Sequence, residues 1–438
     1  MNKYLIYLFL ILISNCIYSK DIQNQLSIVD KLDLPFEFDE NSILQHYFGN
    51  TLYVMPTDQD IASSSELYIF SYTLKDKKLD SMILDFPNEH KNTILYNART
   101  NQIMEIPFFA PKSFAISDKY LVVAGSDKLL VYEYQNNTYV FKYVVFCKEI
   151  YGYDDNLCFD NFLIKDDILL GYRCTIADAG GFGGYSVFAK NAADTEMVST
   201  AIMKYDLNTH NLLNFKIINP EPKGAGYLNF SPRNNMDCSG KYFIISDVIE
   251  YNLYLYDTDW KLIDMINPKH KEWIIDKDFP DIKTIATAYK SGTSISLLEP
   301  FTYKTSLTHN VFFQNDSTII VSWSVPNGSN DRHNRYTFYF DKYAIRNNKL
   351  VLLDTYEEAK VDKNSSISFL LSGANAIKYP RNYFMNYNYM FTISGDIPFS
   401  IFSNEIKQMS LKDYYKKLDD YYISNDGKKS ILIYRFNK

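Results

Sequence analysis

Six charged or imidazole side chains are the strongest candidates for chemistry in this 438-residue sequence. Each comes a few residues ahead of a polar turn that leads into a short apolar run. They are His46, Lys112, Asp160, Asp237, His309 and Arg381. If such groups converge on one point, they bind an anionic or polar ligand, or hold a metal ion. The alternative is a hydrated channel lined by unrelated polar side chains.

No short catalytic or metal-binding motif accompanies these residues. The histidines form no H-E-x-x-H pair, and no G-x-S-x-G elbow is present. The glycine-rich run 180–184 lacks the Lys-Ser/Thr of a phosphate loop and predicts a mobile loop. The acidic runs 58–60, 154–156 and 276–278 do not match the calcium loop. We therefore expect no catalytic residue, no metal and no cofactor.

The elements that position the six candidates belong to a repeat. A polar turn before a short apolar strand occurs six times, with turn residues at Asn50, Asp118, Asp166, Gly240, Asp316 and Asn386. The intervals between them are 68, 48, 74, 76 and 70 residues. Most copies are followed by an aromatic strand, a tight turn and another apolar strand, which is the pattern of a β-hairpin. Each repeat therefore predicts about four strands.

Aromatic residues support this interpretation. They make up 16% of the chain, and Tyr and Phe favour half-buried strands. A tyrosine marks the aromatic strand in five copies: Tyr72, Tyr134, Tyr205, Tyr256 and Tyr343. The sixth copy ends with 430–438 and lacks a partner strand, which residues 25–32 would supply. A strand from the other end of the chain would close a ring of sheets without an open edge.

The predicted fold is all-β: a six-bladed β-propeller of four-stranded antiparallel blades, the last closed by the N-terminal strand. The predicted blades are roughly 43–84, 112–146, 158–218, 235–266, 308–356, and 382–438 with 25–32. The chain resembles the exported six-bladed propeller proteins of the Bacteroidetes type, with a TolB-like or NHL-like shape, over nearly all of 20–438. The resemblance rests on strand pattern and spacing, so it implies a fold and little about function. The innermost strands of a propeller line its channel, which would put the six candidates at the channel mouth.

Several long segments separate the predicted strands, and long loops on a rigid scaffold often carry function. A short helix is expected around 270–278 and a longer one over 403–421, where apolar residues fall at helical spacing.

Residues 1–19 have the features of an export signal. Lys3 precedes the apolar run 5–13, which is too short to span a bilayer comfortably, and small residues follow. Cys16 is a candidate for lipidation, and a transmembrane anchor is the alternative. Export exposes the remaining cysteines to oxidant, so Cys147 and Cys158 are predicted to pair, with free buried thiols as the alternative. The expected location is the periplasm, the cell envelope or the outside of the cell.

A net charge of −7 argues against a nucleic-acid partner. The sequence favours a non-catalytic, extracytoplasmic binding or scaffold protein. Its unknown protein or glycan ligand would meet the channel mouth and the inter-blade loops, and a lipid at the N-terminus would be its only membrane contact. The alternative is a hydrolase or lyase acting on a sugar, lactone or peptide, which would need His46, Asp160, Asp237 and His309 within reach of one point.

Overall fold

The computed structural model describes residues 26–36, 38, 43–57, 66–97, 102–151, 159, 161–172, 200–218, 236–247, 249–280, 284, 297, 300–301, 304–328, 336–357, 383–386, 389–395 and 429–436. Within these residues the chain forms six four-stranded antiparallel sheets and one two-stranded hairpin. Cys16, Cys158, Asp160, Arg381 and the segment 403–421 lie outside them.

The first three sheets follow each other along the chain. Sheet 1 contains β2 (Ile43–Phe48), β3 (Thr51–Pro56), β4 (Glu66–Thr73) and β5 (Lys78–Asp85). Sheet 2 contains β8 (Ser113–Ile116), β9 (Tyr120–Ala124), β10 (Lys128–Gln135) and β11 (Thr138–Phe146). Sheet 3 contains β12 (Asn161–Lys165), β13 (Ile168–Tyr172), β14 (Thr200–Asp206) and β15 (Asn211–Ile218).

The other three sheets complete the series, and the last one joins the two ends of the chain. Sheet 4 contains β16 (Met236–Cys238), β17 (Tyr242–Ser246), β18 (Leu253–Asp257) and β19 (Leu262–Ile266). Sheet 5 contains β20 (Leu307–Asn315), β21 (Thr318–Pro326), β22 (Tyr336–Arg346) and β23 (Lys349–Glu357). Sheet 6 contains β24 (Tyr383–Asn386), β25 (Tyr389–Gly395) and β26 (Lys429–Phe436), and β1 (Leu26–Leu32) pairs with β26.

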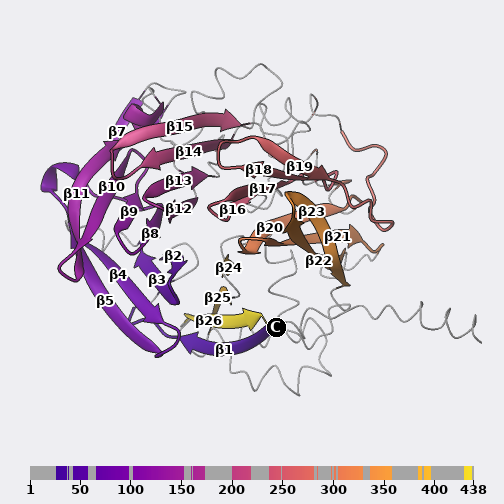
Figure 1. Ribbon diagram of the computed structural model, residues 1–438, viewed down its shortest axis with the longest axis horizontal. Coiled ribbons are helices and arrows are strands. Elements are labelled where there is room, and N and C mark those ends of the chain that lie inside the picture. Colours follow the sequence, from indigo (N-terminus) through magenta and orange to yellow (C-terminus); the bar gives the residue numbers. More distant parts are fainter. Residues whose placement is uncertain are drawn as a thin grey trace, which may run out of the picture.

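The sheets are arranged around a common centre (Figure 1), with β2, β8, β12 and β16 towards the middle and β1, β5, β11 and β15 along the rim. Neighbouring first strands contact each other, as β2 does with β8 and β20 with β24. Consecutive antiparallel sheets around a centre define a β-propeller. The predicted all-β class and the pairing of the N-terminal strand with the C-terminal one are confirmed.

The hydrophobic core lies between neighbouring sheets. One apolar cluster joins sheets 1 and 2 through residues such as Leu67 and Leu130, and another joins sheets 4 and 5 around Trp323. Strands β9 and β17 are buried along their whole length. Their sequences are therefore nearly continuous apolar runs rather than alternating ones.

One tyrosine position recurs in all six sheets. It lies on the third strand, opposite the second residue of the second strand, and is occupied by Tyr72, Tyr132, Tyr205, Tyr256, Tyr343 and Tyr434. In sheets 2 to 5 the register with the outer strand shifts at this tyrosine, as a β-bulge does. Tyr134, the tyrosine predicted for the second copy, lies near the end of β10 as expected. It is two residues beyond Tyr132 and on the same face of the strand.

The two ends of the propeller differ. Because each sheet is antiparallel, the turns between its first and second strands and between its third and fourth lie at one end. These turns contain two to four residues: 49–50, 74–77, 117–119, 136–137, 166–167, 207–210, 239–241, 258–261, 316–317 and 347–348. We call this the short-turn end. The remaining connections, of three to forty residues, leave from the opposite end, which we call the long-connection end.

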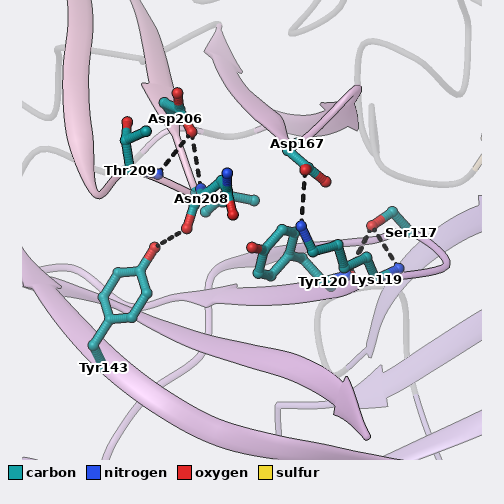
Figure 2. Close-up of polar contacts among 9 residues, drawn as sticks. Ser117, Lys119, Tyr120, Tyr143, Asp167, Asp206, Asn208 and Thr209 are labelled. Carbon is teal, nitrogen blue, oxygen red and sulfur yellow. Dashed lines mark hydrogen bonds and ion pairs between the residues drawn. The ribbon is translucent and has the colours of Figure 1, made fainter.

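Contacts between sheets fix the short-turn end. Between sheets 2 and 3, the ammonium of Lys119 lies 2.9 Å from Oδ2 of Asp167, and the Tyr143 hydroxyl donates to the carbonyl oxygen of Leu207 at 3.0 Å (Figure 2). Equivalent contacts follow around the ring. Lys204 pairs with Asp259 at 2.9 Å between sheets 3 and 4, and the Tyr242 hydroxyl donates to Oδ1 of Asn348 at 2.9 Å between sheets 4 and 5.

A separate hairpin stands in the connection between sheets 1 and 2. It contains β6 (Thr93–Asn97) and β7 (Gln102–Ile106), after the short 3-10 helix η2 (Asn88–His90). A buried ion pair fixes its base, because the ammonium of Lys128 lies 2.9 Å from Oδ2 of Asp127 and also donates to the carbonyl oxygen of Asn92. The same Asp127 oxygen accepts the backbone N–H of Ile94 at 3.0 Å.

The segment 267–280, which we call the strap, contains no helix, contrary to the expectation for 270–278. It packs as irregular chain against sheets 4 and 5. Trp273 Nε1 donates to the carbonyl oxygen of Ile249 at 2.9 Å, and Ile274 and Ser306 exchange two hydrogen bonds of 2.9 and 2.7 Å. These contacts outweigh a weak helical preference. Among the residues that the structure describes, α3 (Cys147–Tyr151) is a single short turn, and no helix is long and apolar enough to cross a bilayer.

Candidate functional site

His46 lies in β2 but is enclosed between sheets 1 and 2. Its ring centroid is 5.8 Å from that of Phe114, and the imidazole hydrogen-bonds to the backbone of Ile116. Desolvation by burial lowers the pKa of His46 from 6.5 to about 4. The imidazole is therefore neutral at pH 7, and it connects two sheets.

Asp237 lies in β16 and joins three sheets. Its Oδ1 accepts the hydroxyl of Tyr172 from sheet 3 at 3.1 Å. Its Oδ2 accepts the backbone N–H of Phe313 from sheet 5 at 2.7 Å. Both carboxylate oxygens thus have protein partners, and these contacts explain why a charged residue occurs in an inner strand.

The other predicted candidates are distributed as follows. Lys112 precedes β8 at the long-connection end, and its side chain is exposed. His309 lies in β20 at a register shift opposite β21, and its side chain is outside the described part of the chain, as are Asp160 and Arg381. His46 and Asp237 serve different interfaces, the first between sheets 1 and 2 and the second among sheets 3, 4 and 5.

The cysteines show no reactive environment in the described residues. Cys147 is buried at the start of α3, and its predicted partner Cys158 lies outside the described residues, so their disulfide stays a prediction. Cys238 in β16 is a free, buried thiol whose Sγ accepts the backbone N–H of Gly240 at 3.3 Å. Burial raises the pKa of Cys238 well above its usual value, which keeps it protonated and unreactive.

One dense, buried polar cluster among the described residues was missed by sequence reasoning. Asp341 in β22 is fully buried, and its Oδ1 accepts the hydroxyl of Thr355 at 2.8 Å. Its Oδ2 accepts the hydroxyls of Tyr343, at 3.0 Å, and of Tyr251, and lies 2.6 Å from Nε2 of His270. Burial raises the pKa of both tyrosines far above the usual value, and the negative charge of Asp341 raises it further.

Stacked rings enclose this cluster. They follow the order Trp273, Tyr251, His270, Trp323 and Tyr339, with successive centroid distances of 5.1, 5.3, 4.3 and 4.2 Å. The histidine–carboxylate pair has the geometry that enzymes use to orient a general base. Here the imidazole is sandwiched and only 11% exposed, so the pair fastens the strap to sheets 4 and 5. Asp341, within an aromatic strand, could have been suspected from sequence, but His270, on irregular chain, could not.

Among the described residues, no group of three or more His, Cys, Asp or Glu side chains could hold a metal ion. Asp247 is buried at the turn after β17, where Oδ1 accepts the backbone N–H groups of Ile249 and Glu250 at 3.0 Å each. Desolvation by burial raises the pKa of Asp247. Its contacts order a turn at the long-connection end.

Comparison with known proteins supplies no family. No family model matches the chain, and no curated protein matches it. A luciferin-regenerating enzyme is 11% identical, with 94% of this chain and 96% of that one covered and a TM-score of 0.38. A europium-containing methanol dehydrogenase is 10% identical, with 96% and 95% covered and a TM-score of 0.34. Myxococcus xanthus glutaminyl cyclase is 7% identical, with 75% and 97% covered and a TM-score of 0.28. Likenesses this low carry no argument about function.

Proposed function

We propose that this protein is a six-bladed, extracytoplasmic propeller that acts as a non-catalytic binding or scaffold protein. Its protein or glycan partner meets the channel mouth and the connections of the long-connection end. The six four-stranded sheets are then the six blades, and the chain reaches its location through the export signal at 1–19.

The contrast between the two ends is the observation that carries this proposal. Side-chain and backbone bonds between neighbouring sheets engage the short turns, as between Lys119 and Asp167. The connections that vary in length all leave from the other end, where Lys112 is exposed. A rigid scaffold that varies on one side only is typical of a binding protein.

The described inner-strand residues favour binding over catalysis. The enzyme alternative needs His46, Asp160, Asp237 and His309 within reach of one point, and the structure describes the side chains of His46 and Asp237. His46 is neutral and buried between two sheets. Both carboxylate oxygens of Asp237 accept hydrogen bonds from residues of neighbouring sheets. Neither residue is then available as an acid, base or metal ligand at the channel mouth.

Site-specific photo-crosslinking tests the proposal. Lys112 is replaced by p-benzoylphenylalanine in cells that make the protein, and Lys241, exposed at the short-turn end, receives the same replacement as a matched control. We expect an adduct from position 112 and none from 241, in the extracytoplasmic fraction. Digestion of the adduct by protease or by glycosidase separates a protein partner from a glycan. An adduct from 241 alone, or adducts from neither position, would contradict the proposal.

A further inference from the structure

A group of tyrosines at the short-turn end has no role in the function proposed above. It contains Tyr53 from sheet 1 and Tyr134 and Tyr139 from sheet 2, beside the turn residue Asp118. We call these four residues the tyrosine cluster. We propose that the tyrosine cluster binds an alkylated ammonium group, such as a quaternary ammonium or a methylated lysine side chain.

Two hydrogen bonds hold Tyr134 and Tyr139 against the turn that carries Asp118. The backbone N–H of Tyr134 donates to the carbonyl oxygen of Lys119 at 2.7 Å. The hydroxyl of Tyr139 donates to the carbonyl oxygen of Ser117 at 2.5 Å. The turn itself is fixed, because Oγ of Ser117 accepts the backbone N–H of Tyr120 at 2.9 Å (Figure 2). A ligand would therefore meet rings that are already ordered, which keeps the entropy cost of binding low.

Two of the three tyrosine rings pack against the core, and the third is exposed to solvent. Tyr53 and Tyr139 are half-buried and pack against the apolar cluster between sheets 1 and 2. Tyr134 is 45% exposed, and its ring centroid lies 5.1 Å from that of Tyr139 with a 59° angle between the planes. Two rings tilted in this way form a corner of aromatic surface. Tyrosine rings give a large contact area and lose little conformational entropy when a ligand binds.

Asp118 places a negative charge near these rings. Asp118 is exposed and forms no ion pair with any residue in the described part of the chain. The charge of Asp118 acts on two of the rings. Burial raises the pKa of Tyr53 and of Tyr139, and the negative charge of Asp118 raises both pKa values further. The neighbouring Lys119 does not neutralise it, because the ammonium turns to Asp167 on sheet 3 (Figure 2).

These features select one class of ligand. Aromatic faces attract cations through their quadrupole, and alkylated ammonium groups lose little hydration when they stack on a ring. The carboxylate of Asp118 adds a charge of the right sign near Tyr53 and Tyr139. A neutral sugar would use the rings but not the charge, and an anion would be repelled.

Choline is the probe, and 3,3-dimethylbutan-1-ol, its neutral counterpart of the same shape, is the matched control ligand. Binding to the full mature chain is measured by saturation-transfer NMR and calorimetry. We expect saturable choline binding in the millimolar range, and at least tenfold weaker binding of the neutral alcohol. Equal binding of the two, binding of N-acetylglucosamine instead of choline, or no saturation by choline would overturn the assignment.

Variants locate the site. Tyr134→Leu removes the exposed ring and should weaken choline binding about fivefold or more, whereas Tyr134→Phe should keep it, since the ring face remains. Asp118→Asn should weaken it several-fold, with the loss smaller at high salt. Tyr68→Leu is the matched control, because the Tyr68 hydroxyl donates to Glu66 at 3.0 Å and no ring of the described residues stacks on Tyr68. Circular dichroism confirms folding of each variant. Unchanged choline binding by Tyr134→Leu would refute this location.

Discussion

At the scale of single residues, polar side chains buried between sheets act as connectors. Asp237 links three sheets, Asp341 collects four side chains, and His46 joins sheets 1 and 2. Buried polar groups are costly unless they are hydrogen-bonded, and a bonded one fixes how two sheets meet. The sequence could propose His46 and Asp237 as ligands because they have the right chemistry. It could not show that their partners are backbone and side-chain groups of neighbouring repeats.

His46 should make stability depend on acidity. Its pKa is about 4 in the folded protein and 6.5 without burial, so the unfolded chain binds the proton more readily. Stability contributed by the neutral imidazole is complete above pH 6.5 and is lost as pH falls towards 4. The full loss is about 3 kcal/mol. His46→Gln keeps an N–H donor for the backbone of Ile116 and cannot titrate, so urea unfolding should show a flatter fall in stability between pH 7 and pH 4.5.

A second substitution separates titration from hydrogen bonding. His46→Phe also removes the titrating group and keeps an aromatic ring beside Phe114. It should flatten the pH profile equally while costing about 1 kcal/mol at pH 7 from the lost hydrogen bond. If either variant loses stability on acidification as steeply as the natural protein, the buried-histidine explanation is wrong.

At the scale of elements, local pattern predicts strands well and irregular segments poorly. Apolar runs such as 120–124 predict strands because both faces of such a strand are buried, and tight turns between two runs predict hairpins. Tyr134 lies in its predicted strand, whereas the register position shared by all six sheets is held by Tyr132, two residues away on the same face. The strap around His270 was expected to be helical, and its contacts with Ile249 and Ser306 come from sequence-distant chain. Such tertiary contacts leave no local signal.

The hairpin β6–β7 depends on a buried ion pair. The side chains of Lys128 and Asp127 are only 4% and 13% exposed, and Lys128 also bonds to the carbonyl oxygen of Asn92. Lys128→Met removes the cation and leaves Asp127 buried without its partner. We expect a loss of about 3–5 kcal/mol in the free energy of unfolding, and faster hydrogen exchange at residues 93–97.

Lys78→Met is the matched control for this ion pair. Lys78 pairs with Asp80 at 2.9 Å, but both side chains are more than half exposed. Water screens such a pair, so the loss should stay below about 1 kcal/mol. Equal losses in the two variants would show that burial does not govern the contribution of Lys128.

At the scale of the whole molecule, the sequence repeat predicted the fold, but it did not predict which residues form a site. Each sheet is built from four antiparallel strands with the same register at the third strand, so the same strands, turns and tyrosine recur in the sequence. A site is different, because its residues come from separate repeats and meet only after folding. Tyr53 and Asp118 belong to different sheets, and no spacing along the chain relates them.

Closure of the ring by β1 is the property that belongs to the whole chain. Ser27 lies opposite Arg435 in the antiparallel pairing of β1 with β26. The double variant Ser27→Cys and Arg435→Cys should form a disulfide, detected by mass spectrometry of the linked peptides. Since the bond closes a loop of about 400 residues, it should raise the free energy of unfolding by about 6 kcal/mol in the chain-entropy account, reversibly on reduction. Ser27→Cys with Lys429→Cys, out of register at the other end of β26, should form no such bond. A link in the control pair but not in the register pair would show that the ring closes differently.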